Sequence, residues 1–262
     1  MEILKPKVTW VVLFWNRVDL LRQAMEHNIA NTGVARHDYE LVMVDNGSVD
    51  GATDYAETLN PETLVKNHKN LGVAKGYNRG MVMATGEFIV ITGMDMLMPD
   101  NWMRTYLDYF EKIPDTGVVS MYSGPLSWVP ERARGGKGPG DWVYETINGL
   151  PTVKGMPFGR RMFRTDMLKH FGYFYEGLGL YGYEDVHWGF RAEQVCDEMG
   201  LRYYVIPDKI PQHLGTEGIK LYDGMDGKEY HAFKQREAND PEKHRIIADL
   251  GSRGWPIERP FP

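Results

Sequence analysis

A stripe of small residues beside a short apolar run constrains the fold of this chain more than any other feature. Four small residues recur every four positions in it, namely Gly72, Gly76, Gly80 and Ala84. In a helix they share one face, and a face without side chains lets another backbone or a bulky phosphate group approach closely. Residues 88–91 then predict a buried strand, and Asp95 follows just beyond it. Because open α/β sheets bind ligands at the C-terminal ends of their strands, we expect a site at Asp95.

Strands alternate with helices through the first hundred residues. Runs rich in β-branched and aromatic residues predict strands at 8–14, 41–44, 63–66 and 88–92. Apolar residues at helical spacing predict a helix at 18–29, and the small-residue stripe predicts another before the fourth strand. This alternation indicates a parallel sheet with helices on both faces.

The second half of the chain has a different rhythm. Its predicted helices and strands lie at 101–110, 117–122, 185–199 and 202–206. A loop rich in Gly, Pro and Arg occupies residues 124–140, and loops of this length inside compact domains are usually functional lids or disordered. The polar tail from residue 221 predicts one helix at 227–238 and an irregular end. The sequence contains no internal repeat, so we expect the two halves to form one continuous domain.

Composition excludes several classes of protein. The chain has 262 residues and a formal net charge of −6, which argues against a surface built as a whole to bind nucleic acid. Its one cysteine, Cys196, excludes an internal disulfide framework and a multi-cysteine zinc site. No apolar run reaches the roughly 20 residues that span a bilayer, and the first residues lack the apolar core of a signal peptide. We therefore expect a soluble, cytoplasmic protein.

Several familiar motifs are absent from the sequence. It contains no G-x-x-x-x-G-K-[ST] loop, no G-x-G-x-x-G dinucleotide fingerprint and no H-E-x-x-H pair. It also lacks a serine nucleophile elbow. What remains is a set of carboxylates at the ends of predicted strands and helices, with one histidine further on: Asp45, Asp95, Glu184, Asp185 and His213.

Five segments, in order and at similar spacing, resemble the family 2 glycosyltransferases of the GT-A fold. They are residues 8–17, the run VDNGSVDG at 44–51, Asn70-Leu71-Gly72 with Gly76, Asn78 and Gly80, residues 84–99 with Asp95, and Glu184-Asp185 followed by Phe190-Arg191-Ala192. The resemblance covers roughly residues 8–215. It implies an α/β fold of GT-A type, Rossmann-like, in which a mixed, mainly parallel central sheet is flanked by helices.

The resemblance also implies an activity and a division of the chain. Residues 1–220 would form a single GT-A domain, with a nucleotide-sugar-binding half at 1–100 and an acceptor half at 101–220. Residues 221–262 would add a C-terminal helix and tail. The implied activity is metal-assisted, hexosyltransferase-like transfer of a sugar from a nucleotide-diphosphate sugar, by preference a UDP-sugar, to an acceptor hydroxyl. Direct displacement by that hydroxyl would invert the anomeric centre.

The functional residues of the family fall on particular positions here. The resemblance assigns Asp45 to the nucleotide base, Asp95 to a divalent cation (manganese or magnesium) on the diphosphate, and Asp185 to the general base. Glu184 shares the catalytic position with Asp185, and His213 stands where some members place another metal ligand. The implied nucleotide-sugar-binding residues are Phe14, Asn16, Arg17, Asp45, Asn46, Asn70, Gly72, Lys75, Gly76, Asn78 and Met94.

These residue types suit that chemistry. A nucleoside diphosphate is a poor leaving group until its developing charge is neutralised, which Mg²⁺ or Mn²⁺ on oxygen ligands achieves. The acceptor hydroxyl needs a base placed opposite the leaving group, and one carboxylate can serve.

The chain departs from the family pattern at Gly93, because the first position of the D-x-D motif is acidic or Asn in the family. Asp95 is then the one carboxylate of that motif. Three outcomes stay open: a weaker metal site completed by water and diphosphate, compensation by His213, and lost catalysis. Mg²⁺ often takes only one or two carboxylates and keeps several waters, so loss of the metal is not forced. Lost catalysis would make the chain a non-catalytic nucleotide-sugar or carbohydrate-binding protein.

Simpler roles stay open for the same residues. The stripe could pack a helix on a sheet without touching a ligand. Asp45 could end its strand through an Asx turn, and Glu184 and Asp185 could be acids favoured by a helix dipole. Basic residues in the second half permit a polyanionic acceptor, such as DNA with a hydroxymethylated base: Arg132, Arg134, Lys137, Arg160, Arg161 and Arg164. Glycan, lipid-linked and small-molecule acceptors are equally open.

Overall fold

The computed structural model describes residues 6–121, 144–155 and 159–214, together with positions 232 and 241. The loop predicted at 124–140 lies outside the described residues, and so does the tail predicted from residue 221, apart from those two positions.

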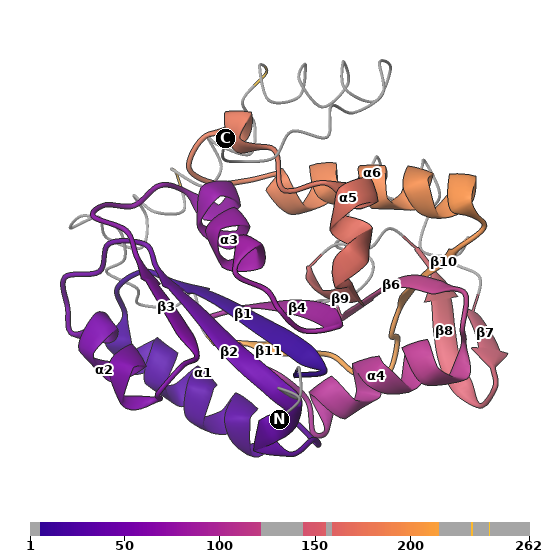
Figure 1. Ribbon diagram of the computed structural model, residues 1–262, viewed down its shortest axis with the longest axis horizontal. Coiled ribbons are helices and arrows are strands. Elements are labelled where there is room, and N and C mark those ends of the chain that lie inside the picture. Colours follow the sequence, from indigo (N-terminus) through magenta and orange to yellow (C-terminus); the bar gives the residue numbers. More distant parts are fainter. Residues whose placement is uncertain (1–5, 122–143, 156–158, 215–231, 233–240, 242–262) are drawn as a thin grey trace, which may run out of the picture.

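Within the described residues, a nine-stranded mixed sheet has the order β3-β2-β1-β4-β9-β6-β10-β8-β7 (Figure 1). Its strands are β1 (Val8–Phe14), β2 (Tyr39–Asp45), β3 (Thr63–Lys66), β4 (Phe88–Gly93), β6 (Thr116–Met121), β7 (Tyr144–Ile147), β8 (Leu150–Lys154), β9 (Arg160–Arg164) and β10 (Arg202–Val205). Strands β9 and β8 run antiparallel to their neighbours, whereas β3, β2, β1 and β4 are parallel to one another. The prediction of a mixed, mainly parallel sheet is confirmed.

Helices cover both faces of this sheet. They are α1 (Val18–Ala30), α2 (Ala52–Thr58), α3 (Val73–Val82), α4 (Trp102–Lys112), α5 (Leu168–Phe171) and α6 (Glu184–Met199), with short 3₁₀ turns η1 (Arg36–Asp38), η5 (Thr165–Met167) and η6 (Glu176–Leu178). In Figure 1, α1, α2 and α4 lie on one face, and α3, α5 and α6 lie on the other. A two-stranded sheet of β5 (Met96–Leu97) and β11 (Gln212–His213) is also present.

Buried tryptophans build the core beneath β1. Trp10 and Trp102 of α4 meet edge to face with ring centroids 5.0 Å apart, and both are fully buried. Each indole N–H has an acceptor: Trp10 donates to Thr92 Oγ1 at 2.8 Å and Trp102 donates to the Asn28 carbonyl at 3.0 Å. Buried indoles need such partners. The bond from Trp102 ties α4 to α1, and the ring contact with Trp10 places α4 against the sheet.

The small-residue stripe brings α3 unusually close to the sheet. A Cβ atom on Gly76 would collide with the Leu13 side chain. A Cβ on Gly80 would collide with Val11 and would lie 3.0 Å from Val44 Cγ2. This face of α3 therefore covers β1 and β2. The prediction of a shared helix face is confirmed for these two glycines, and at both of them the face packs on the sheet.

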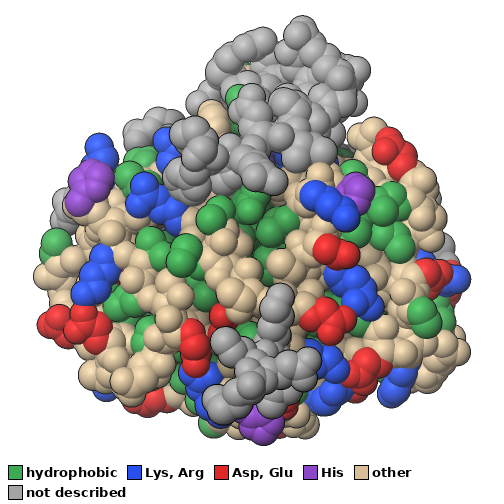
Figure 2. Space-filling view, in the orientation of Figure 1, with side chains coloured by type: hydrophobic (Ala, Val, Ile, Leu, Met, Phe, Trp, Pro, Cys, Tyr) green, Lys and Arg blue, Asp and Glu red, His purple; other side chains and the backbone are tan. Residues whose placement is uncertain are grey.

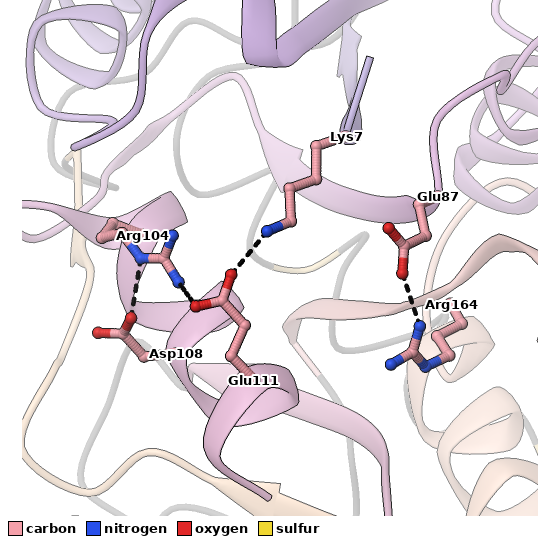
Figure 3. Close-up of polar contacts among 6 residues, drawn as sticks. All are labelled: Lys7, Glu87, Arg104, Asp108, Glu111 and Arg164. Atoms are coloured by element: carbon pink, nitrogen blue, oxygen red, sulfur yellow. Dashed lines mark hydrogen bonds and ion pairs between the residues drawn. The ribbon is translucent and has the colours of Figure 1, made fainter. Parts of the chain in front are cut away.

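Ion pairs tie the start of β1 and the middle of the sheet to their neighbours (Figure 3). Lys7 pairs with Glu111 of α4 at 2.6 Å, and Arg104 pairs with the same carboxylate at 2.5 Å. Arg164 of β9 pairs with Glu87 just before β4 at 2.7 Å. These side chains are about a third to a half exposed, so we assign each pair only about 0–1 kcal/mol of stability.

A membrane-spanning helix is not found in the described part of the chain, where every helix is too short or too polar to cross a bilayer.

Substitution of Gly80 tests the close approach of α3. An exposed Gly→Ala change inside a helix stabilises a protein by about 1 kcal/mol through helix propensity. Here the added methyl group collides with Val11, a stiff β-branched side chain in the core, so we expect Gly80→Ala to destabilise by about 1–3 kcal/mol in urea unfolding. Lys75→Ala on the exposed face of α3 is the matched control, with little expected change. A Gly80→Ala protein as stable as the wild type would contradict the packing.

Candidate active site

The carboxyl ends of three parallel strands meet at one edge of the sheet. Phe14 lies opposite Asp45 where β1 and β2 end. On the other side of β1, Leu13 lies opposite Gly93, the last residue of β4. Asp95 follows two residues later. The segments after these strands therefore gather at the edge where α/β sheets bind ligands.

The turn after β1 has a backbone conformation that few residues tolerate. Asn16 and Arg17 have φ angles of 52° and 54°, both in the left-handed region. The Asn16 N–H donates to Ser48 Oγ and the Val49 N–H donates to Asn16 Oδ1, both at 2.8 Å. Arg17 pairs with Asp19 at 2.6 Å, and its Nη1 is buried without a hydrogen-bond partner among the described residues. Backbone strain of this kind clusters at ligand sites.

The residues just before this turn connect β1 to the end of β4. The Trp15 N–H donates to Met94 Sδ at 3.3 Å, and its indole donates to the Gly47 carbonyl at 3.2 Å. Phe14 is 1% exposed and packs in the core, and its contact with a nucleotide stays a prediction. Met94, which was predicted to bind the nucleotide sugar, directly follows β4 at the carboxyl edge of the sheet.

Asp45 holds the turn that follows β2. Its carboxylate is 3% exposed and accepts the Ser48 N–H on Oδ1 at 2.8 Å and the Thr53 hydroxyl on Oδ2 at 2.5 Å. The simpler role as an Asx turn is therefore present. The contact with a nucleotide base stays a prediction.

Asn46 organises the loop that leads to α3. Its Nδ2 donates to Asn70 Oδ1 at 2.9 Å and to the Gly72 carbonyl at 3.2 Å. Its Oδ1 accepts the Asn67 side chain and the Leu71 N–H, both at 3.0 Å. The amide groups of Asn46 and Asn70 thus hold the loop together, and they position its backbone at the site edge.

Two residues predicted to contact the nucleotide have structural roles. Gly76 faces Leu13 of the sheet. Asn78 is fully buried; its Nδ2 donates to the Phe174 carbonyl at 2.9 Å and to Glu176 at 3.0 Å, and its Oδ1 accepts the Phe174 N–H at 2.9 Å. Asn78 therefore fastens the segment before α6 to α3, with both hydrogens of its amide nitrogen used. Its contact with a nucleotide stays a prediction.

The N-terminus of α3 is covered by backbone from the second half of the chain. Gly72 has φ 89°, and a Cβ there would lie 2.9 Å from the Gly179 carbonyl oxygen and the Leu180 Cα. The Val73 N–H donates to the Leu180 carbonyl at 2.9 Å. Lys75 is exposed in the first turn of α3. The first helical N–H is thus already used, and Gly72 permits the close crossing of two chain segments.

Asp95 and His213 come together although they are far apart in the sequence. β11 pairs with β5, and the Leu214 N–H donates to the Asp95 carbonyl at 2.7 Å. His213 Nε2 lies 3.2 Å from Asp95 Oδ2. Burial alone would raise the pKa of Asp95, but the hydrogen bond from His213 and the positive charges of His213 and Arg160 lower it overall. The two candidate metal ligands therefore lie side by side.

Glu184 and Asp185 begin α6, at the same edge. Asp185 Oδ1 accepts the Val186 N–H at 2.8 Å, and the Asp185 carbonyl accepts Arg161 Nη1 at 3.3 Å. Glu184 keeps partial solvent contact but lies deep among protein atoms. That burial, with the negative charge of Asp185 as a second cause, raises the pKa of Glu184 to about 7. One acid of the pair is therefore held near the protonation boundary at neutral pH.

Tyr77 of α3 lies between the two groups of acids. Its hydroxyl donates to the Thr92 carbonyl at 3.0 Å, at the end of β4, and burial raises its pKa above the ordinary range. The charged groups that act on its phenol come from both halves of the chain: Arg160, Asp95, Glu184 and Arg161. Tyr77 thus marks where the halves meet. No motif in the sequence pointed to Tyr77, and its position next to Gly76 in the first half of α3 was the available signal.

Three arginines grouped in the sequence lie in different places. Arg161 is 1% exposed, with its guanidinium 4.8 Å from the Trp188 ring. Arg164 pairs with Glu87 at the opposite end of β9, and Arg160 lies near Gly93. These three arginines therefore do not form one basic surface: Arg161 lies on the other face of β9 from Arg160, and Arg164 lies at the other end of the strand. The other predicted basic residues, Arg132, Arg134 and Lys137, lie outside the described residues. In the described part of the face in Figure 2, basic and acidic side chains are interspersed.

Few of the described side chains at this edge could bind a divalent cation. Among the described residues, no three His, Cys, Asp or Glu side chains converge as a metal-binding group. Asp95 and His213 provide two donors at one point. Mg²⁺ is commonly held by one or two protein ligands together with substrate phosphates and water. The residues fit a cation that is shared with a bound diphosphate, and they do not fit an all-protein cage.

Comparison with known proteins identifies the family. Residues 9–172 match the family described as Glycosyl transferase family 2. A cholesterol galactosyltransferase of Borreliella burgdorferi is 28% identical over 89 residues, which are 33% of this chain and 24% of that protein. The chain thus matches only about a quarter of the length of that relative. The chain belongs to glycosyl transferase family 2.

Solved structures share the architecture. TarS of S. aureus, residues 1–349, is similar with a TM-score of 0.65 and 17% identity over 97% of this chain and 67% of that chain. TarS has also been solved with UDP and with UDP-GlcNAc. The mannosyltransferase PcManGT from Pyrobaculum calidifontis, in complex with GDP-Man and Mn²⁺, has a TM-score of 0.58 and 22% identity over 94% and 69% of the two chains. At these identities the likeness shows the fold, and the predicted GT-A fold is confirmed.

The raised pKa of Glu184 predicts a pH-dependent stability difference. Between its ordinary pKa of 4.5 and about 7, the folded protein retains a proton that the unfolded chain releases. The Glu184 contribution to the free energy of unfolding therefore falls as pH rises through this window. Glu184→Gln removes this cost of ionising a buried acid. In urea unfolding, the stability of the variant relative to wild type should therefore be higher at pH 7.5 than at pH 4.5.

Glu198→Gln at the exposed far end of α6 is the control, and its stability difference from wild type should be the same at both pH values. An equal difference for Glu184→Gln would show that Glu184 is not destabilised by its surroundings.

Proposed function

We propose that this chain transfers a sugar from a nucleotide-diphosphate sugar, most directly a UDP-sugar, to an acceptor hydroxyl with inversion at the anomeric carbon. One observation carries the proposal: Asp95, just after β4, and Glu184, at the start of α6, both lie close enough to the Tyr77 phenol for their charges to raise its pKa. The donor-side carboxylate and Glu184, the sequence neighbour of the candidate base Asp185, therefore lie near one point at the sheet edge. The family membership and the UDP, UDP-GlcNAc and GDP-Man complexes of structural neighbours support a nucleotide-sugar donor.

Asp185 is the proposed general base. The Val186 N–H fixes its Oδ1, and Oδ2 accepts no hydrogen bond from the described residues. In the proposed reaction, Asp185 takes the proton of the acceptor hydroxyl while the acceptor oxygen bonds to the anomeric carbon. The bond from that carbon to the diphosphate oxygen breaks, and its electron pair leaves with the nucleoside diphosphate. Because the pKa of Glu184 is raised to about 7, this side chain is partly protonated at neutral pH, which reduces the negative charge beside Asp185.

The donor side would be held by residues of the first half. Asp95 and His213 would hold a divalent cation, which when bound neutralises charge on the leaving diphosphate. The turn of Asn16 and Arg17 would line the nucleotide, with Asp45 next to the base. Arg17 supports this arrangement because its buried Nη1 can still donate a hydrogen bond to a ligand.

The acceptor is proposed by its chemistry, as a molecule with a free hydroxyl that Asp185 can deprotonate. A modified DNA acceptor loses part of its support because Arg160, Arg161 and Arg164 do not form one basic surface. Glycan and small-molecule acceptors with a free hydroxyl remain the proposed class.

Replacement of the base tests the catalytic assignment. We expect Asp185→Asn to lower the transfer or donor-hydrolysis rate by about 10²–10⁴-fold, because general base catalysis contributes that much. The binding of donor, measured by thermal shift, should stay within about twofold of the wild type. Glu193→Gln, further along α6, is the control and should retain full activity. Full activity in Asp185→Asn would exclude it as the base.

Thermal shift with nucleotide sugars separates the enzyme from a non-catalytic binding protein. UDP-glucose, UDP-GlcNAc, UDP-galactose and GDP-mannose, each with and without Mn²⁺, form the panel. A donor at 100 times its Kd should add about 2.7 kcal/mol of stability, and more with Mn²⁺ if the cation is shared. Stabilisation without any turnover would favour the non-catalytic alternative suggested by Gly93. No stabilisation by any member would contradict the proposed donor class.

A further inference from the structure

The space beside Gly93 is bordered by one negative and one positive group. A Cβ atom on Gly93 would lie 2.8 Å from Asp95 Oδ1 and 3.9 Å from Arg160 Nη2. A side chain at this position would need the Asp95 carboxylate to turn away. Asp95 and Arg160 therefore border the space beside Gly93 at the site edge.

The antiparallel direction of β9 places Arg160 at this edge. Because β9 runs opposite to β4, its first residues lie beside the carboxyl end of β4, with Arg161 opposite Ile91. The backbone of Arg160 is held on the other side by pairing with Met121. Tyr106 of α4 donates its hydroxyl to the Arg160 carbonyl at 2.8 Å. The side chain thus extends from a fixed backbone position on a strand interior to the sheet.

The balance of charge at the edge favours an anion-binding role for Arg160. Asp95, Glu184 and Asp185 place three acids near the Tyr77 phenol and α6. A diphosphate adds more negative charge at the same edge and needs a positive group close by. Arg161 is buried against aromatic rings and donates to the Asp185 carbonyl, so it faces the base. Arg160, partly exposed next to Gly93, is the arginine on the donor side.

We propose that Arg160 binds the diphosphate of the donor and supplies, next to Asp95, fixed positive charge that lets the site function with a single carboxylate at the end of β4. A planar guanidinium suits this task because it donates two parallel hydrogen bonds to phosphate oxygens. Its charge does not depend on loading of a cation. This inference rests on the proposed function and adds a binding residue to it. The consequence is that nucleoside diphosphate binding persists when divalent cations are removed.

Calorimetric titration of UDP and GDP tests this role without requiring turnover. Wild type, Arg160→Met and Arg160→Lys are each titrated with the better of the two nucleotides, in EDTA and in Mn²⁺. In EDTA we expect Arg160→Met to bind at least about tenfold more weakly than wild type, because charge-assisted hydrogen bonds to phosphate are lost. Arg160→Lys should keep part of the affinity. Uridine or guanosine, which carry no phosphate, should bind all three proteins equally.

Arg164→Met is the matched control, because Arg164 lies on the same strand but pairs with Glu87 away from the site edge. It should bind the nucleoside diphosphate as the wild type does. If Arg160→Met does not fold, judged by circular dichroism and its unfolding midpoint, the partial loss in Arg160→Lys carries the test.

Two results would overturn the inference, and they are distinguishable. Undiminished diphosphate affinity in Arg160→Met, with a wild type that binds, would exclude Arg160 and leave the proposed function standing. Failure of the wild type to bind UDP, GDP or any sugar nucleotide, with or without Mn²⁺, would overturn the proposed function together with the inference.

Discussion

Helix α3 can lie directly on β1 and β2 because Gly76 and Gly80 present no side chain to the sheet. This close approach sets the position of the residues on the rest of the helix. Tyr77 reaches the carbonyl of Thr92 at the end of β4, and Asn78 fastens the segment that leads to α6. A larger residue in the stripe would lift the helix and move both contacts. The geometry of the site therefore depends on a packing interaction that itself contacts no ligand.

The site combines groups from both halves of the chain at one edge of the sheet. Asp95 stands at the end of β4, and His213 reaches it through the pairing of β11 with β5. The antiparallel strand β9 adds Arg160 to this edge, and α6 adds Glu184 and Asp185. Burial raises the pKa of Glu184, whereas the hydrogen bond from His213 and the nearby positive charges outweigh burial and lower the pKa of Asp95. These differences give the acids different protonation states at neutral pH.

Sequence periodicity predicted the first half of the fold well, because buried parallel strands are continuous apolar runs. The strands expected at 8–14 and 63–66 coincide with β1 and β3. Strand β9 was missed because its sequence, RRMFR, is dominated by charge that only the tertiary structure neutralises or buries. The proximity of Asp95 and His213 could come only from the family resemblance, since strand pairing over such a separation leaves no local pattern. The structural role of Asn78 left no signal in the sequence, because its partners Phe174 and Glu176 lie 96 and 98 residues further along the chain.

A crystal structure of the protein with UDP and Mn²⁺ tests the central claim, that the donor diphosphate binds at the carboxyl edge between Asp95 and the start of α6. The account predicts a cation bound by Asp95 and His213, phosphate oxygens beside Arg160, and the uracil near Asp45. A diphosphate located away from the ends of β1 and β4, with Asp95 and Arg160 making no contact to it, would contradict the account.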